Sequence, residues 1–188
     1  MKHEVVVIGT SAGGLYALTT LLETLPRHFP IPILIVQHRS KEERTLLEEV
    51  LSHKCEISIR QAEEKEPIQS GTVYFAPPDY HLLIERNKTF SLSSDERVNY
   101  SRPSIDVLFE TAADVYKNKT LAILLTGANQ DGAAGIKIVK KYGGTTMAQD
   151  PLEAMYPVMP KSAIDTGQVD HIMTLASIKT YLLGINKR

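Results

Sequence analysis

The sequence predicts an α/β fold, a doubly wound and mostly parallel sheet with antiparallel hairpin strands at one edge, and three observations support this. Short apolar runs alternate with stretches whose apolar residues recur at helical spacing, as in βαβ units. Several of these runs are apolar throughout, which is typical of strands covered by helices on both faces. The middle of the chain instead has three short β-rich segments divided by turn residues, a pattern typical of hairpins. The predicted class is Rossmann-like.

The length and composition of the chain indicate one globular domain over residues 1–188. The chain is 43% hydrophobic and 23% charged, close to the average for globular domains, which excludes the disordered and fibrous classes. Its net charge of −1 gives no general attraction to nucleic acid. No apolar run approaches the ~18 residues that span a bilayer, and the apolar stretch from Val5 to Ile8 starts too early and is too short for a signal peptide. We therefore expect a cytoplasmic protein that is not inserted in a membrane.

Strands and helices are expected to alternate in the first third of the chain. The expected strands are residues 4–8, 31–37 and 55–59, and the expected helices are residues 13–25 and 40–51. In the first helix leucines recur every three or four positions, and Pro26 ends the pattern. Ser40 would cap the second helix, whose glutamates would face solvent.

The rest of the chain is expected to form the hairpin region and then further βα units. Residues 72–76, 80–85 and 89–92 are the hairpin strands, which we place at one edge of the sheet. The elements expected after them are helices at 103–117, 131–142 and 175–183 and strands at 121–126, 145–149 and 169–173. The parallel strands of such a sheet all end at the same edge.

Three reactive side chains follow the carboxyl ends of these strands. Ser11 comes after the first strand, His38 ends the second, and Asp131 lies just beyond the strand at 121–126. Open α/β sheets bind their ligands at this edge, near the point where the strand order reverses. A serine nucleophile needs an imidazole to take its proton, and the imidazole needs a carboxylate to orient it. These residues therefore predict a Ser-His-Asp hydrolase.

The loop after the first strand separates this interpretation from dinucleotide binding. A Rossmann fingerprint would have glycine at position 11 and an acidic residue at the end of the second strand. This chain has Ser11 and His38 at those places, a nucleophile and a base. Arg39 would still suit a 2′-phosphate, so nucleotide binding stays open as the minor alternative.

The same loop fits the nucleophile-elbow pattern G-x-S-x-G, in which small neighbours let the serine sit on a sharp strand-to-helix turn. The amides of Ala12 and Gly13, together with the helix dipole, would stabilise an oxyanion. The chain order Ser11, His38, Asp131 differs from the Ser, Asp, His order of common α/β-hydrolases and disfavours that family.

Each candidate residue also has a structural interpretation. Ser11 would serve as a helix N-cap, His38 as a surface histidine, and Asp131 as a turn or cap residue in Asp-Gly. The conjunction of the three favours catalysis. His81 is expected to be structural or to face the substrate, and Asp106 ranks below Asp131 because helix capping explains it.

Five strings of the sequence resemble one known family. They are Ile8-Gly-Thr-Ser-Ala-Gly-Gly14, Val36-Gln-His38, Arg102-Pro-Ser-Ile-Asp106, Leu125-Thr-Gly-Ala-Asn-Gln-Asp-Gly-Ala-Ala-Gly135 and Met159-Pro-Lys-Ser-Ala-Ile164. In this order they resemble the catalytic domain of the CheB-type protein-glutamate methylesterases of bacterial chemotaxis. The resemblance implies Ser11 as nucleophile, His38 as base and Asp131 as the third triad member.

The resemblance also implies a reaction. Members of the family hydrolyse glutamate γ-methyl esters on chemoreceptors, and many also deamidate receptor glutamines. By this resemblance Ser11 attacks the ester carbonyl, methanol leaves and water releases the carboxylate, with no metal and no cofactor. The implied partner is a methylated chemoreceptor or a similar signalling protein, and no nucleic acid is involved.

Three departures from the family are visible in the sequence. Familiar members carry a receiver domain first, whereas Met1 here leads directly into the first strand, so we expect no phosphorylation control within this chain. Position 12 is alanine where the best-known members have threonine, and Ala128-Asn129 replaces Met-Gly beside the cleft. Two alternative functions stay open, a non-catalytic signalling module of the same fold and an esterase or amidase for a small molecule.

Overall fold

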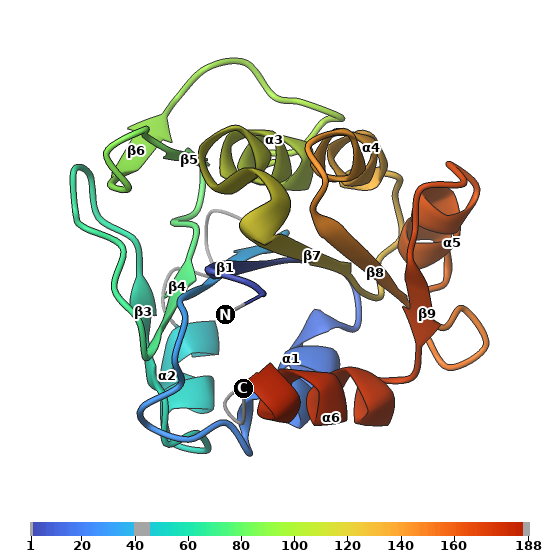
Figure 1. Cartoon of the computed structure of the whole chain (residues 1–188), viewed down its shortest axis with the longest axis horizontal. Helices are drawn as coiled ribbons and strands as arrows, with labels where there is room; N and C mark the ends of the chain where they lie inside the picture. The colour runs from blue at the N-terminus through green and yellow to red at the C-terminus, as the bar shows by residue number, and fades with distance from the viewer. Residues whose placement is uncertain (1, 40–45, 186–188) are drawn as a thin grey trace.

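The central feature of the computed structural model, which describes residues 2–39 and 46–185, is a seven-stranded parallel sheet (Figure 1). Its strands are β1 (Val5–Thr10), β2 (Ile33–Gln37), β3 (Ser58–Gln61), β4 (Thr72–Phe75), β7 (Thr120–Leu124), β8 (Thr145–Gln149) and β9 (His171–Met173). Their order is β3-β4-β2-β1-β7-β8-β9, and each neighbouring pair is parallel. This arrangement confirms the doubly wound α/β class.

Helices cover both faces of the sheet. They are α1 (Gly14–Leu22), α2 (Leu46–Ser52), α3 (Ile105–Tyr116), α4 (Ala133–Lys141), α5 (Val158–Ile164) and α6 (Leu175–Ile185), with the 3-10 turn η1 (Lys117–Lys119) after α3. Figure 1 shows α3, α4 and α5 on one face and α1, α2 and α6 on the other. Successive side chains of β1 point to opposite faces of the sheet and so belong to two hydrophobic cores. Val5 and Val7 pack on the α3 side, while Val6 and Ile8 pack on the α1 side.

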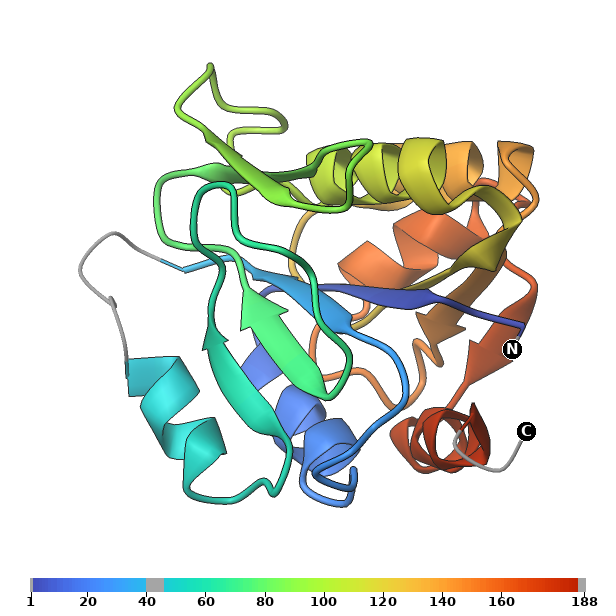
Figure 2. The same ribbon diagram turned by 60° about the vertical axis from the view of Figure 1, so that its left-hand side comes forward.

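The hairpin region differs from the expectation in two respects. Residues 72–76 are expected to be antiparallel, yet β4 pairs in parallel with β2 and β3 inside the main sheet. The antiparallel strands β5 (His81–Ile84) and β6 (Phe90–Ser93) are present, but they form a separate two-stranded sheet beside α3 (Figure 2). Packing explains their place, because Leu82 and Phe90 are buried in the core under α3.

Three further points concern the helices. The sequence pattern does not predict α5, which contains Pro160; the proline lies in the first turn, where its missing N–H removes no helical bond. The expected cap Ser40 and the first residues of its helix lie outside the described residues. Within residues 2–39 and 46–185, no helix is both long and apolar enough to cross a bilayer.

The ends of β1, β2 and β7 meet in the middle of the sheet. After β1 the chain builds one side of the sheet with β2, β3 and β4, and it later returns to the opposite side of β1 with β7, so the strand order reverses there. The register sets Thr10 beside Gln37 and Gly9 beside Leu124. The residues that follow these strands are therefore neighbours at the edge where open α/β sheets bind ligands.

Candidate active site

Ser11 begins the loop between β1 and α1, and hydrogen bonds tie this loop to the neighbouring strand ends. Its N–H donates to the carbonyl of Thr126 at 3.0 Å, and its carbonyl accepts a bond from Nε2 of Gln37 at 2.9 Å. The N-cap of α1 is Gly13, and no side chain caps the helix. The structure thus contradicts the capping role of Ser11, whose side chain is only partly buried.

The two glycines after Ser11 are required by the backbone. Gly13 has a φ of 81°, in the left-handed region that favours glycine. A Cβ on Gly14 would lie 1.9 Å from Oε1 of Gln37, so only glycine lets Gln37 reach the Ser11 carbonyl. Within the described part of the chain, no hydrogen bond occupies the N–H groups of Ala12 and Gly13, which lie just ahead of the N-terminus of α1.

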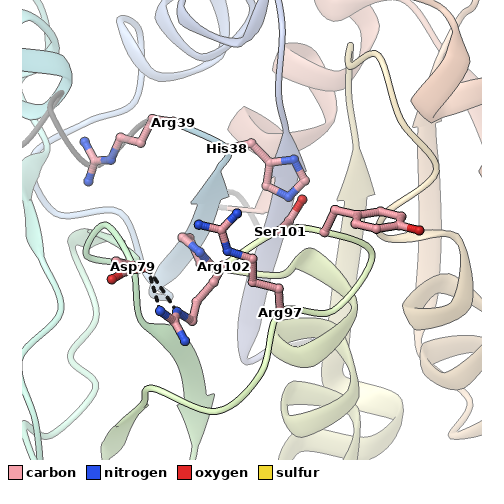
Figure 3. Close-up of a pocket in the computed structure, with 8 residues that line it drawn as sticks. His38, Arg39, Asp79, Arg97, Ser101 and Arg102 are labelled. Atoms are coloured by element: carbon pink, nitrogen blue, oxygen red, sulfur yellow. Dashed lines mark hydrogen bonds and ion pairs between the residues drawn. The ribbon is translucent and has the colours of Figure 1, made fainter.

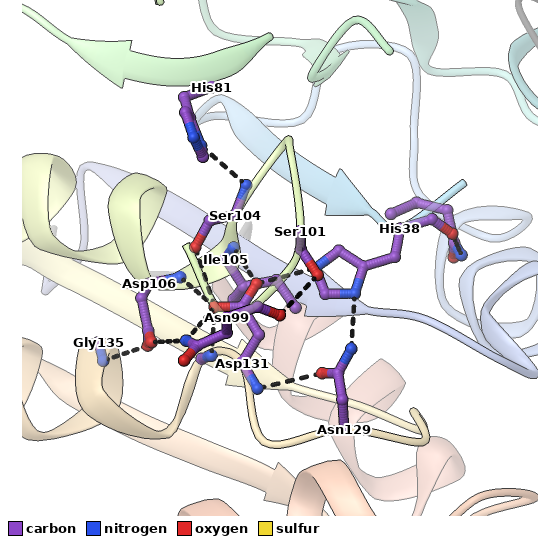
Figure 4. A network of polar contacts seen from close by, with 12 residues as sticks. His38, His81, Asn99, Ser101, Ser104, Ile105, Asp106, Asn129, Asp131 and Gly135 are labelled. Carbon is purple, nitrogen blue, oxygen red and sulfur yellow. Dashed lines mark hydrogen bonds and ion pairs between the residues drawn. The ribbon is translucent and has the colours of Figure 1, made fainter. Parts of the chain in front are cut away.

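His38 follows β2 directly, and its ring is held on two sides (Figure 4). Nε2 lies 2.8 Å from Oδ2 of Asp131, and Nδ1 lies 3.2 Å from Nδ2 of Asn129. The carboxylate requires a proton on Nε2, so we assign Nδ1 as the unprotonated nitrogen that accepts from Asn129. The backbone N–H of His38 donates to the carbonyl of Thr10 at 3.0 Å, which places His38 beside Ser11.

Asp131 is fully buried, and its carboxylate accepts many hydrogen bonds. Oδ2 accepts from His38 and from the N–H of Ile105 at 2.7 Å. Oδ1 accepts from Oγ of Ser104 at 2.9 Å, Nδ2 of Asn99 at 3.2 Å and the N–H groups of Asp106 and Gly132 at 3.2 and 3.1 Å. Burial alone would raise the pKa of Asp131, but His38 and the other donors hold it below its ordinary value. The carboxylate is therefore ionised.

The N-terminus of α3 supplies much of this anion site. Ser104 is the N-cap of α3, and the N–H groups of Ile105 and Asp106 both donate to Asp131. A helix N-terminus carries partial positive charge and favours an anion. The Pro103-Ser104 helix start is predictable from the sequence, but its contact with Asp131 is not, because the two lie far apart in the chain.

A second carboxylate, Asp106, lies beside Asp131. Its Oδ1 accepts from the N–H of Gly135 at 2.6 Å, and its Oδ2 accepts from Nδ2 of Asn99 at 2.8 Å. Because the same nitrogen contacts Asp131, Asn99 bridges the two carboxylates. Burial and, secondarily, the charge of Asp131 raise the pKa of Asp106 to about 6. Asp106 thus gains a proton near pH 6 while Asp131 stays charged.

The candidate residues meet, but not all of them are in contact. His38 and Asp131 are hydrogen-bonded, whereas no hydrogen bond joins Oγ of Ser11 to His38 among the described residues. Ser11 lines a cavity of about 540 Å³ together with Gln37, Lys54 and the exposed Leu15, Tyr16 and Met155. Ala128 is exposed on the loop between β7 and α4, one residue before Asn129.

His81 has a structural role. Its Nδ1 accepts from the N–H of Ser104 at 3.1 Å, and its Nε2 donates to the carbonyl of Glu96 at 3.0 Å. These bonds join the hairpin to the start of α3. In the ranges that the structure describes, no cluster of His, Cys, Asp and Glu side chains is arranged to hold a metal ion.

Comparison with known proteins assigns the family. The family model of the CheB methylesterase matches residues 6–182. The chain belongs to the CheB methylesterase family. A CheB relative from Leptospira interrogans, provisionally named protein-glutamate methylesterase/protein-glutamine glutaminase, is 52% identical over 187 residues, which cover 100% of this chain and 97% of the relative.

A Thermotoga maritima protein and a solved catalytic domain extend the CheB comparison. The protein-glutamate methylesterase/protein-glutamine glutaminase of that organism is 37% identical over 98% of this chain and 55% of its own length. The crystal structure of its CheB methylesterase catalytic domain is 36% identical, covers 98% of this chain and 100% of that domain, and has a TM-score of 0.93. The chain thus spans nearly the whole Leptospira relative but about half of the full-length Thermotoga protein. The predicted CheB resemblance is confirmed.

Proposed function

We propose that this chain is a protein-glutamate methylesterase in which Ser11 is the nucleophile, His38 the general base and Asp131 the carboxylate that orients His38. The observation that carries the proposal is the 2.8 Å bond between Nε2 of His38 and Oδ2 of the buried Asp131, at the strand end beside Ser11. The names of the relatives support the same reaction class.

The bond to Asp131 gives the two ring nitrogens of His38 different roles. Nε2 keeps its proton, so Nδ1 takes the proton of Ser11 as its Oγ attacks the ester carbonyl carbon. Asn129 now bonds to Nδ1 and would yield that position to the Ser11 hydroxyl when substrate binds. The buried charge of Asp131 stabilises the imidazolium that forms.

The remaining steps use the same residues. The N–H groups of Ala12 and Gly13 would bind the oxyanion of the tetrahedral intermediate, helped by the dipole of α1. The bond to the methoxy oxygen then breaks, and His38 gives its proton to the departing methanol. Water attacks the resulting glutamyl ester of Ser11 and passes a proton to His38. Ser11 leaves with that proton, and the glutamic acid side chain that is released ionises to the carboxylate by giving its proton to water.

The proposed substrate is a methylated chemoreceptor or a similar signalling protein in the cytoplasm. The same steps would deamidate a glutamine, with ammonia in place of methanol, and relatives are named for both activities. Ala128 would lie along the approach of the substrate, because it is exposed on the loop that carries Asn129 and Asp131. Its methyl group leaves room there for a bulky protein surface.

Release of methanol from radiomethylated receptor membranes tests this function. Wild-type protein is expected to release the label, and the Ser11→Ala variant is expected to retain it. Hydrolysis of simple esters with full retention of label on the receptor would instead support a small-molecule esterase. Binding to the membranes without hydrolysis of either substrate would support a non-catalytic signalling module.

A further inference from the structure

A cavity of about 320 Å³ lies beside His38, and the proposed reaction does not use its other side chains (Figure 3). His38 forms part of its wall, and three arginines, Arg39, Arg97 and Arg102, form much of the rest. The reaction of Ser11 with an uncharged ester does not explain why three cationic side chains lie next to the proposed general base.

Two of the three guanidinium groups are neutralised by carboxylates. Arg39 is buried and makes a two-pronged pair with Glu48, with bonds of 2.8 and 2.6 Å. Arg102 pairs with Asp79 at 2.8 Å. Arg97 has no hydrogen bond and no ion pair to any residue in the ranges 2–39 and 46–185. Figure 3 shows its side chain turned toward the other lining residues, so its positive charge is uncompensated there.

The backbone before Arg97 is fixed in place. The carbonyl of Glu96 accepts the 3.0 Å bond from Nε2 of His81. Arg102 reaches back and donates to the carbonyls of Ser94 and Asp95 at 2.6 and 2.8 Å. Arg97 therefore projects from a segment that is already ordered without any ligand.

The backbone after Arg97 is tied to the catalytic carboxylate. Val98 and Ser101 close a tight turn through two backbone hydrogen bonds of 3.1 and 2.9 Å. Within this turn, Asn99 points inward and bonds to Asp131 at 3.2 Å. The turn thus sets the position of Arg97 relative to the His38–Asp131 pair, which lowers the ordering cost of binding a ligand there.

We propose that Arg97 binds a carboxylate of the substrate protein, from an Asp or Glu side chain near the esterified glutamate. This inference rests on the proposed function, which places the ester at Ser11. A guanidinium pairs with a carboxylate through two parallel bonds, and no carboxylate of the described residues occupies Arg97. The cavity at Ser11 has one cationic side chain, Lys54, among lining residues that include Leu15, Tyr16 and Met155, so it is less cationic than the cavity at Arg97 and the difference would orient the substrate.

The test compares two versions of a methylated receptor in membranes, each with a single ester site. One version has glutamates at the flanking positions and the other has alanines, and methanol release gives kcat/KM. Wild-type protein is expected to prefer the acidic version about fivefold at low salt, with the preference falling as salt screens the pair. Arg97→Ala should remove the preference through KM, and Arg97→Glu should reverse it, with the preference taken in each variant as the ratio of kcat/KM for the acidic and alanine versions.

Arg86→Ala is the matched control. Arg86 is 92% exposed in the turn between β5 and β6, outside this cavity, so the preference should persist in that variant. Equal turnover of the two receptor versions by wild-type protein, or a preference that survives Arg97→Ala, would overturn the role of Arg97 and leave the methylesterase function standing. Failure of the wild-type protein on both versions would refute the methylesterase function and the role of Arg97 together.

Discussion

Nδ2 of Asn129 lies 3.2 Å from Nδ1 of His38, on the side of the ring opposite Asp131. Oδ1 of Asn129 accepts the N–H of Asp131 at 3.1 Å, so the amide is fixed with its NH₂ group toward the ring. Asn129 is thus a neutral donor to Nδ1, and a charge introduced at this position would act directly on His38.

Asn129→Asp should move the acid limb of the kcat/KM profile to higher pH by about one unit. A carboxylate beside Nδ1 favours the protonated ring, which cannot accept the proton of Ser11. Methanol release measured between pH 5 and 9 gives the profile. Gln130→Glu is the control, because it adds the same charge on an exposed neighbour and should shift the limb much less. Equal shifts in both variants would contradict a direct contact with the base.

Asp106→Asn should have the opposite effect. Burial raises the pKa of Asp106 to about 6, so above that pH Asp106 carries a negative charge. This charge lies beside the pair formed by Asp131 and His38, where it favours a positively charged ring. Removing the charge should move the acid limb to lower pH by about 0.5 unit. Asp170→Asn serves as control, because Asp170 pairs with Lys140 away from the site. An unchanged limb in Asp106→Asn would show that Asp106 does not act on His38.

Asp131→Asn should lower kcat roughly 10⁴-fold, as in other triads, because His38 would lose its orientation and its charge partner. The free energy of unfolding of the variant should also be lower by about 1–3 kcal/mol, because an amide NH₂ would face buried donors such as the N–H of Ile105. Denaturant titration separates the two effects. Near-normal turnover in a folded Asp131→Asn protein would mean that another residue orients His38.

His3 should make the protein less stable as the pH is lowered from 7 to 5. Burial, followed by the charges of Lys2 and Lys119, lowers the pKa of His3 to about 4 from 6.5. The unfolded chain then binds a proton that the folded chain excludes, so stability is lost as pH falls below 6.5, by up to about 2 kcal/mol at pH 5. His3→Gln, which can keep a bond to Tyr181, should flatten this dependence in urea titrations. Parallel curves for the two proteins would refute this role of His3.

The parallel strands and the strand-end residues could be predicted because their signals are local. Continuous apolar runs identify buried strands, and Ser11 and His38 directly follow two of them. The parallel pairing of β4 is hidden by the turn residues Pro77-Pro78-Asp79 that follow it, because they indicate a hairpin, although Thr72–Phe75 is buried throughout as parallel strands are.

The hydrogen-bond partners of Asp131 and His38 could not be predicted for a different reason. Asn99, Ser104 and Ile105 reach Asp131 only after α3 and the 98–101 turn have packed against the loop that follows β7. Asn129 lies in the same short loop as Asp131, so it could have been considered from the Gly-Ala-Asn-Gln-Asp string. Its contact with His38, however, depends on the orientation of the ring, which no spacing pattern specifies.

The most direct test of the proposed catalytic centre is the site of labelling by a serine-directed fluorophosphonate, mapped by mass spectrometry on the intact protein. We expect a single adduct on Ser11, a much slower reaction in His38→Ala and no adduct in Ser11→Ala. Ser101→Ala is the control, because Ser101 lines the cavity beside His38 and its loss should leave labelling of Ser11 unchanged. An adduct on Ser101, or no adduct on the folded wild-type protein, would contradict the assignment of Ser11 as nucleophile.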